Sequence, residues 1–186
     1  LDSAINKTSG ADTSLTLEAE RNVTVNAGIT STSGALDVNL HSDTDGDGLG
    51  AVLINADIAT NGGTFKSGSG TTIESGSVGT YFGNQGKMGD RHVTTNGGAI
   101  NLYGDVAIGL NGGTLTLDTK NKTTGASGVV KVTGTVDSGN SYKRVSSGLE
   151  GWEDFIKSYY DEVMSDEDKY TAPTYTLRRG AEQYPA

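Results

Sequence analysis

Cysteine is absent from this 186-residue chain, proline occurs only twice, and aromatic residues make up 6% of it. Without cysteine no disulfide can hold the fold, so its order must come from hydrogen bonds and packing. The chain has no apolar run near 18 residues and no recognisable signal peptide, which predicts no membrane insertion. Basic residues number 14 against 23 acidic ones, for a net charge of −9. This acidity argues against nucleic acid as a partner.

Glycine is the residue type in excess, with 28 copies, but it follows no three-residue period, so the chain is not collagen-like. Only 33% of the residues are hydrophobic, and low hydrophobicity combined with net charge favours disorder. Against disorder stand several segments in which Val, Ile and Leu alternate with polar residues. That period-two pattern indicates strands with one buried face.

The composition changes near residue 149, which predicts two parts, 1–148 and 149–186. Residues 149–186 contain seven of the twelve aromatic residues and only two glycines. Apolar side chains recur there at spacings of three to four residues, which predicts an amphipathic helix of about 13 residues. We expect this helix either to cap the end of the first part or to contact another subunit, through Trp152, Phe155, Ile156, Tyr159 and Tyr160.

The first part repeats a unit of strand, glycine turn and strand. Copies occupy residues 23–40, 52–66 and 100–118, and a partial copy occupies 129–139. The spacing is about 30 residues, except that roughly 20 extra residues separate the second copy from the third. These extra residues predict either another short coil or an insertion near 79–95.

Two all-β folds remain open at this point, a parallel β-helix and an antiparallel β-sandwich. The repeat favours the β-helix, because a single coil cannot bury its own inner face and needs its neighbours. The Asn-Gly-Gly turns at Asn61, Asn96 and Asn111 supply positive φ, and their side chains could form a partial ladder. Asn-Gly also marks hairpins, which keeps the sandwich as the alternative.

Residues 36–48, 51–55, 58–63 and 100–108 resemble the large filamentous-haemagglutinin-like adhesins exported by two-partner secretion. The resemblance covers roughly residues 15–140. It implies a right-handed parallel β-helix in a longer extracellular protein on a bacterial cell surface. It also implies adhesion to a host or bacterial glycan or protein receptor, and it carries over no catalytic residue.

The sharpest local motif is Asp43-Thr-Asp-Gly-Asp-Gly48. Carboxylates at alternate positions, with glycine between them, allow a tight loop to place oxygen atoms around a hard cation such as Ca²⁺. An EF-hand loop would have a glutamate where this chain has Ile54. The motif therefore predicts either a Ca²⁺ site made by Asp43, Asp45 and Asp47 or a solvated turn; no other cofactor is expected.

A second candidate is the segment 81–92, which breaks the repeat and combines aromatic and polar residues. Insertions on a rigid solenoid are where binding residues often lie. The segment predicts a binding surface made by Tyr81, Phe82, Arg91 and His92. The alternative is a loop that only covers the flank of the solenoid.

The sequence predicts no enzyme. Asp57 and Asp105 fall at equivalent places in two copies of the repeat and could form an acid/base pair on a sugar, but aligned aspartates on a solenoid more often maintain solubility. The two histidines, His41 and His92, have no evident nucleophile or acid partner. We therefore expect an adhesive stalk, with a self-assembling filament subunit as the alternative and a polysaccharide-active β-helix enzyme as the less favoured rival. Sequons at Asn6, Asn22 and Asn121 leave glycosylation open.

Overall fold

The computed structural model describes residues 1–76, 79–83, 89–109, 113–138, 176–179 and 182–185. The chain divides into two units, Leu1–Ser147 and Gly148–Ala186. No helix occurs among the described residues, and none therefore is long and apolar enough to cross a membrane. The predicted amphipathic helix lies outside them. The described part of the second unit is an antiparallel pair, β16 (Thr176–Arg179) and β17 (Glu182–Pro185).

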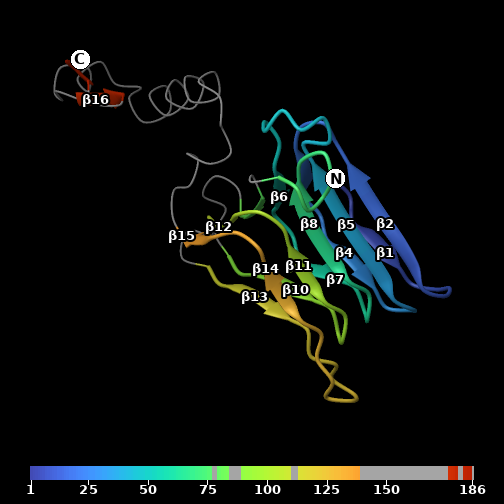
Figure 1. The fold of residues 1–186 in the computed structure, drawn as a ribbon. Coiled ribbons are helices and arrows are strands. Elements are labelled where there is room, and N and C mark those ends of the chain that lie inside the picture. The colour runs from blue at the N-terminus through green and yellow to red at the C-terminus, as the bar shows by residue number, and fades with distance from the viewer. Residues whose placement is uncertain (77–78, 84–88, 110–112, 139–175, 180–181, 186) are drawn as a thin grey trace. The chain divides into compact units, whose positions relative to one another are not determined.

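The first unit consists of three five-stranded sheets (Figure 1). The first sheet contains β1 (Ile5–Lys7), β4 (Ile29–Ser31), β7 (Ile58–Ala59), β10 (Arg91–Thr94) and β13 (Leu115–Asp118). The second contains β2 (Thr13–Glu18), β5 (Leu36–Ser42), β8 (Phe65–Ser69), β11 (Ile100–Leu102) and β14 (Val130–Val132). The third contains β3 (Val23–Val25), β6 (Val52–Ile54), β9 (Thr80–Phe82), β12 (Val106–Ile108) and β15 (Val136–Ser138).

The chain visits the three sheets in the same order five times, so each set of three consecutive strands is one coil. Coil 1 is β1–β3 and coil 5 is β13–β15. Each strand pairs in parallel with the equivalent strand of the next coil. This arrangement confirms the parallel β-solenoid and excludes the antiparallel sandwich.

The register shows that the coils differ in length. Ile5 pairs with Ile29, 24 residues further on, whereas Ile58 pairs with Val93, 35 residues further on. A single sequence period therefore does not exist. The variation lies in the corners between sheets, because each strand keeps its place in the stack.

The predicted alignment of the third repeat copy is wrong by one strand. β6 lies in the third sheet, but β11 lies in the second, and the partner of β6 in the next coil is β9. The extra residues between the copies thus belong to a full coil. The insertion predicted near 79–95 is likewise corrected, because β9 and β10 within that range are regular strands paired with the neighbouring coils.

The interior is filled by columns of inward-facing side chains, one from each coil. In the third sheet Val25, Ile54 and Phe82 stack on one another, and each is fully buried. In the second sheet the register places Phe65 between Val38 and Ile100. Ile54 and Ile58, apolar members of the alternating pattern, are likewise buried. Burial of these columns supplies the main stabilisation of a solenoid.

The corner between the first and second sheets is held by a polar ladder. In four successive coils a buried hydroxyl donates to a glycine carbonyl, from Ser31, Thr60, Thr95 and Thr119 to Gly34, Gly63, Gly98 and Gly128 respectively. Asn61 and Asn96 have φ values of 52° and 54°, and the Asn96 Nδ2 lies 3.3 Å from the Asn61 Oδ1. The predicted asparagine ladder is therefore confirmed for this pair. Asn111 lies outside the described residues.

Candidate functional site

The acidic motif forms the corner between β5 and β6 in coil 2. Three of its residues have left-handed backbone conformations, Asp43 with φ 54°, Gly46 with φ 74° and Gly48 with φ 80°. Aspartate and glycine are among the residues that tolerate this region best. The turn folds back on itself, because the Gly46 N–H donates to the Asp43 carbonyl at 3.0 Å.

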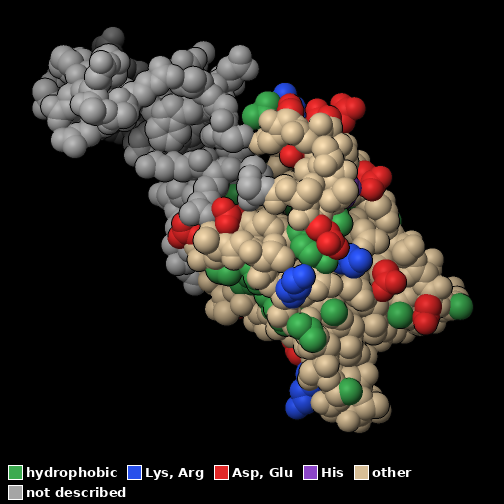
Figure 2. Space-filling view, in the orientation of Figure 1, with side chains coloured by type: hydrophobic (Ala, Val, Ile, Leu, Met, Phe, Trp, Pro, Cys, Tyr) green, Lys and Arg blue, Asp and Glu red, His purple; other side chains and the backbone are tan. Residues whose placement is uncertain are grey.

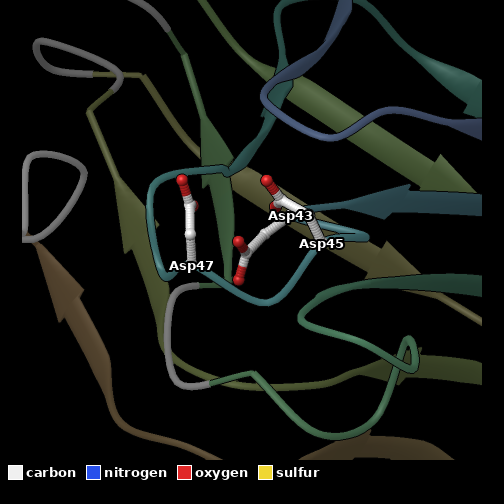
Figure 3. A group of neighbouring side chains, drawn as sticks. All are labelled: Asp43, Asp45 and Asp47. Carbon is white, nitrogen blue, oxygen red and sulfur yellow. The ribbon is translucent and has the colours of Figure 1, made fainter.

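The three aspartates converge inside this turn (Figure 3). One carboxylate oxygen from each of Asp43, Asp45 and Asp47 lies within 4.8 Å of the other two. Asp43 is 3% exposed, whereas the other two are exposed. The Asp43 Oδ1 accepts a hydrogen bond from the Gly48 N–H at 2.9 Å, and the Asp47 Oδ1 accepts one from the Leu49 N–H at 2.8 Å. Each of these two carboxylates keeps its second oxygen for another contact.

A pocket of about 280 Å³ opens beside Asp43. Its other wall is the corner loop of coil 3, which contributes Gly70, Thr71, Ser75 and Gly76. Gly46 packs closely against this loop, since a Cβ at Gly46 would lie 2.5 Å from the Thr71 Cγ2. The pocket therefore combines Asp43 from one coil with the hydroxyl-bearing residues Thr71 and Ser75 from the next.

His41 ties the two walls of the pocket together. Its ring Nε2 lies 2.7 Å from the Gly70 carbonyl, and its Nδ1 lies 3.3 Å from the Glu18 Oε1. His41 is 8% exposed and contacts coils 1 and 3 from its position in coil 2. It is thus a positioning residue for the coil 3 loop.

The donor set suits a hard cation. Carboxylate and hydroxyl oxygens are the ligands of Ca²⁺, which tolerates irregular geometry and six to eight ligands. The three aspartates bring three negative charges to one turn, and mutual repulsion would be relieved by a bound cation. The Ca²⁺ site predicted from the sequence remains a proposal, supported by the convergence of the carboxylates.

We expect Ca²⁺ to stabilise the chain and Asp43→Asn to remove most of that effect. A cation at about 100 times its Kd raises the free energy of unfolding by about 2.7 kcal/mol. Asparagine keeps the Oδ1 that accepts the Gly48 N–H, so the turn survives while the charge is lost. Urea denaturation with and without Ca²⁺ measures the difference. Asp37→Asn is the matched control, because Asp37 also accepts a backbone N–H, from Thr64 at 2.7 Å. No stabilisation of the wild-type chain by Ca²⁺ up to about 10 mM would contradict the proposal.

The residues predicted for receptor binding in segment 81–92 do not form one surface. Phe82 is fully buried in the core, so its predicted place in an exposed site is wrong. Tyr81 is the neighbouring residue on the outer face of β9 and is half-buried. Arg91 and His92 begin β10 in the first sheet, and the His92 side chain is about half exposed, with its Nδ1 3.5 Å from the Asp57 Oδ2.

Asp57 and Asp105 are not equivalent in the fold. Asp57 precedes β7 in the first sheet, whereas Asp105 precedes β12 in the third. Each accepts a hydrogen bond from a backbone N–H of the next coil, as do three other aspartates. The five bonds run from the N–H groups of Ala35, Thr64, His92, Thr114 and Thr135 to the Oδ1 atoms of Asp12, Asp37, Asp57, Asp90 and Asp105. These carboxylates therefore link coils.

Sequence reasoning missed a contact on the outer face of the second sheet. Tyr103 is 7% exposed, lies under the Lys131 ammonium at 5.6 Å from the ring centroid, and makes a side-chain hydrogen bond with Glu74. Burial, followed by that hydrogen bond and the negative charge of Glu74, raises the pKa of Tyr103 above its ordinary value. The coil 3 loop lies over Gly68, where a Cβ would sit 2.0 Å from the Ile73 carbonyl oxygen. The sequence signal for this contact was Gly68 itself, because a glycine inside the alternating pattern of a strand often marks the close approach of another backbone.

Trp152, Phe155, Ile156, Tyr159 and Tyr160, predicted as a cap or subunit contact, lie outside the described residues. Comparisons of the chain with protein-family models, with curated proteins and with solved structures found no significant match. The relationship to filamentous-haemagglutinin-like adhesins therefore stays a prediction from the sequence.

Proposed function

We propose that this chain is a structural stalk module of a bacterial surface or secreted adhesin of the filamentous-haemagglutinin-like kind. The observation that supports the proposal is the stack of five coils in three continuous parallel sheets. Every interior coil is bonded to two neighbours by backbone hydrogen bonds on three faces. Such a stack resists bending and can hold a binding surface away from a cell.

The polar side chains of the solenoid support a structural role in the same way. The aspartates between coils, the hydroxyl ladder and the asparagine pair all bind backbone or side-chain groups of the same unit. The aspartates and the asparagine pair link successive coils, and the hydroxyl groups close the corners within a coil. Because these groups serve the architecture of the solenoid, they favour a scaffold over the rival hypothesis of a polysaccharide-active enzyme. Depolymerisation of an acidic glycan that is lost in Asp57→Ala or Asp105→Ala would favour the enzyme instead.

The receptor of such a module would be a glycan or protein on a host or bacterial cell. Figure 2 shows acidic and basic side chains spread over one face of the solenoid, with several acidic ones gathered at its upper edge. The polar residues at the start of β10, Arg91 and His92, remain the candidates for contact. His92 is exposed and adjoins Asp57, and this pair offers both a donor and an acceptor to hydroxyl groups.

The test is adhesion of beads coated with the 186-residue chain to epithelial and bacterial cells. We expect binding above that of albumin-coated beads, and about a tenfold weaker apparent affinity for the double variant Arg91→Ala/His92→Ala, which corresponds to loss of about 1.4 kcal/mol. Lys120→Ala/Lys122→Ala is the matched control, because it removes two exposed basic groups from the corner of coil 5. Beads that bind no better than albumin would contradict the adhesive part of the proposal.

A further inference from the structure

Each end of the described solenoid presents three strand edges without a strand partner among the described residues. β1, β2 and β3 pair only with coil 2, and β13, β14 and β15 pair only with coil 4. Such edges carry a row of backbone N–H and C=O groups that can pair with another chain. Because the strands of each sheet run in the same direction through all five coils, the coil 1 edge and the coil 5 edge are two different surfaces.

The apolar side chains that are most exposed, or that pack only partly against the core, lie at these two ends. The three large exposed hydrophobic residues of the described chain are all in coil 5, with Val129 68%, Val130 43% and Val136 59% exposed. The side chains that pack only partly against the core also belong to the first or last coil, among them Leu15 and Leu17 in coil 1. Both ends are therefore cross-sections of the core without a covering layer among the described residues.

The register extended by one coil would match these side chains with each other. The second-sheet columns run from Leu15 through Val38, Phe65 and Ile100 to Val130. A further coil 1 stacked beyond coil 5 would place Leu15 against Val130 and Leu17 against Val132. In the third sheet the same operation places Val23 against Val136. Apolar residues would meet apolar residues in both sheets.

The charges of the two ends are complementary. Coil 1 carries four acidic residues against two basic ones, Asp2, Asp12, Glu18 and Glu20 against Lys7 and Arg21. The described residues of coil 5 carry three lysines against two aspartates, Lys120, Lys122 and Lys131 against Asp118 and Asp137. In the extended register Lys131 would lie opposite Thr16, with Glu18 two residues away on the same outer face. Opposite charges at such diagonal positions on a sheet attract.

We propose that copies of this chain stack head to tail, with coil 5 of one copy pairing with coil 1 of the next. An amphipathic helix could cover the exposed valines but has no free backbone groups along its length to pair with three strand edges. Another parallel coil with the same three-sheet cross-section satisfies all three edges at once, and a second copy supplies one. This proposal goes beyond the stalk function and depends on the solenoid architecture, not on adhesion.

The experiment uses two variants of the full chain that block opposite ends, Leu15→Lys and Val130→Lys. Mass is measured by sedimentation velocity and by light scattering after size exclusion, at rising protein concentration. The wild-type chain is expected to grow past the dimer, in steps of its 19.2 kDa mass. Each variant alone is expected to stay monomeric, because an ammonium group at the contact weakens binding at least about thirtyfold. An equal mixture is expected to give a dimer and no larger species, since only one intact pair of ends remains.

Three outcomes would overturn the proposal. These are a wild-type chain that stays monomeric up to about millimolar concentration, a variant that dimerises on its own, or a mixture that remains monomeric. Lysine at Leu15 can keep its stem on the core with the ammonium in water, so the variant is expected to fold. Circular dichroism checks this for both variants, and Val136→Lys, at a position 59% exposed, serves as a second block of the coil 5 end. Adhesion of coated beads is read separately, so a failure of stacking and a failure of adhesion are distinguishable.

Discussion

Replacing Phe82 with alanine is expected to lower the free energy of unfolding of the solenoid by about 3–5 kcal/mol. Phe82 is 0% exposed and lies in a column between Ile54 of coil 2 and Ile108 of coil 4. The cavity left by alanine would lie between Ile54 and Ile108 and weaken the contacts of two neighbouring coils at once. The backbone of β9 is paired on both sides, which limits collapse into the cavity. Urea denaturation followed by circular dichroism measures the effect.

Tyr81→Ala is the matched control for this substitution, because it removes an aromatic side chain from the adjacent, outward position of the same strand. We expect a cost well below that of Phe82→Ala. Similar losses from both variants, or a loss of less than about 1 kcal/mol from Phe82→Ala, would contradict the placement of Phe82 in the core. The result also bears on function, since a core residue cannot contact a receptor.

The general architecture could be predicted from the sequence because its signals are local. Alternation of apolar and polar residues in 52–58 and 100–106 indicates strands, and the absence of a helical pattern between them excludes βαβ units. The Asn-Gly-Gly turns at Asn61 and Asn96 specify positive φ at the corners, and both have it. Repetition of these units then favours stacked coils.

The phase of the repeat could not be predicted, and Phe82 was misplaced for that reason. All three sheets use the same apolar alternation, so a copy shifted by one strand looks as regular as the true one. Corners of variable length hide the error, because no fixed period tests it. β9 carries a polar inward residue, Thr80, in the column of Val52 and Val106. This departure made β9 look like part of an insertion.

One part of the candidate site could likewise be predicted from the sequence, and another part could not. The spacing of Asp43, Asp45 and Asp47 is local, so the convergence of their carboxylates could be expected from the motif. The opposite wall of the pocket could not, because Thr71 and Ser75 come from the next coil and meet Asp43 only through the register. The roles of Asp57 and Asp105 were missed for the same reason, since their partners His92 and Thr135 lie 35 and 30 residues away.

At one corner of the solenoid, glycine is required for a reason that sequence spacing alone does not reveal. Gly63, Gly98 and Gly128 follow the first-sheet strands of coils 3, 4 and 5 and stack on one another. A Cβ on each would lie 2.0–2.2 Å from a carbonyl oxygen of the preceding coil. The coils approach so closely here that only a residue without a side chain fits. Close approach, not positive φ, is the requirement at this column.

Gly98→Ala is therefore expected to destabilise the stack by about 3 kcal/mol, at the upper end of the usual cost of overpacking. The new Cβ would lie 2.1 Å from the Gly63 carbonyl oxygen and 2.6 Å from its carbon, and backbone atoms held in a ladder cannot move aside as a side chain can. The methyl group would separate coils 3 and 4, and stability in a solenoid is the sum of coil contributions and contacts between neighbours. Hydrogen exchange should show faster exchange of amides in β10–β15, with those of β2 and β5 nearly unchanged.

Gly28→Ala is the control that isolates the steric effect. Its Cβ would meet the Asp57 carbonyl oxygen at 3.5 Å, an ordinary van der Waals contact, and its φ does not lie in the left-handed region. Restricting the unfolded chain by replacing glycine with alanine stabilises a protein by about 0.4–1 kcal/mol where the native conformation is compatible. We thus expect opposite signs for two substitutions of the same type at two corners of one solenoid. Equal effects, or faster exchange throughout the first unit in Gly98→Ala, would contradict the inference that close approach of coils 3 and 4 excludes a side chain at Gly98.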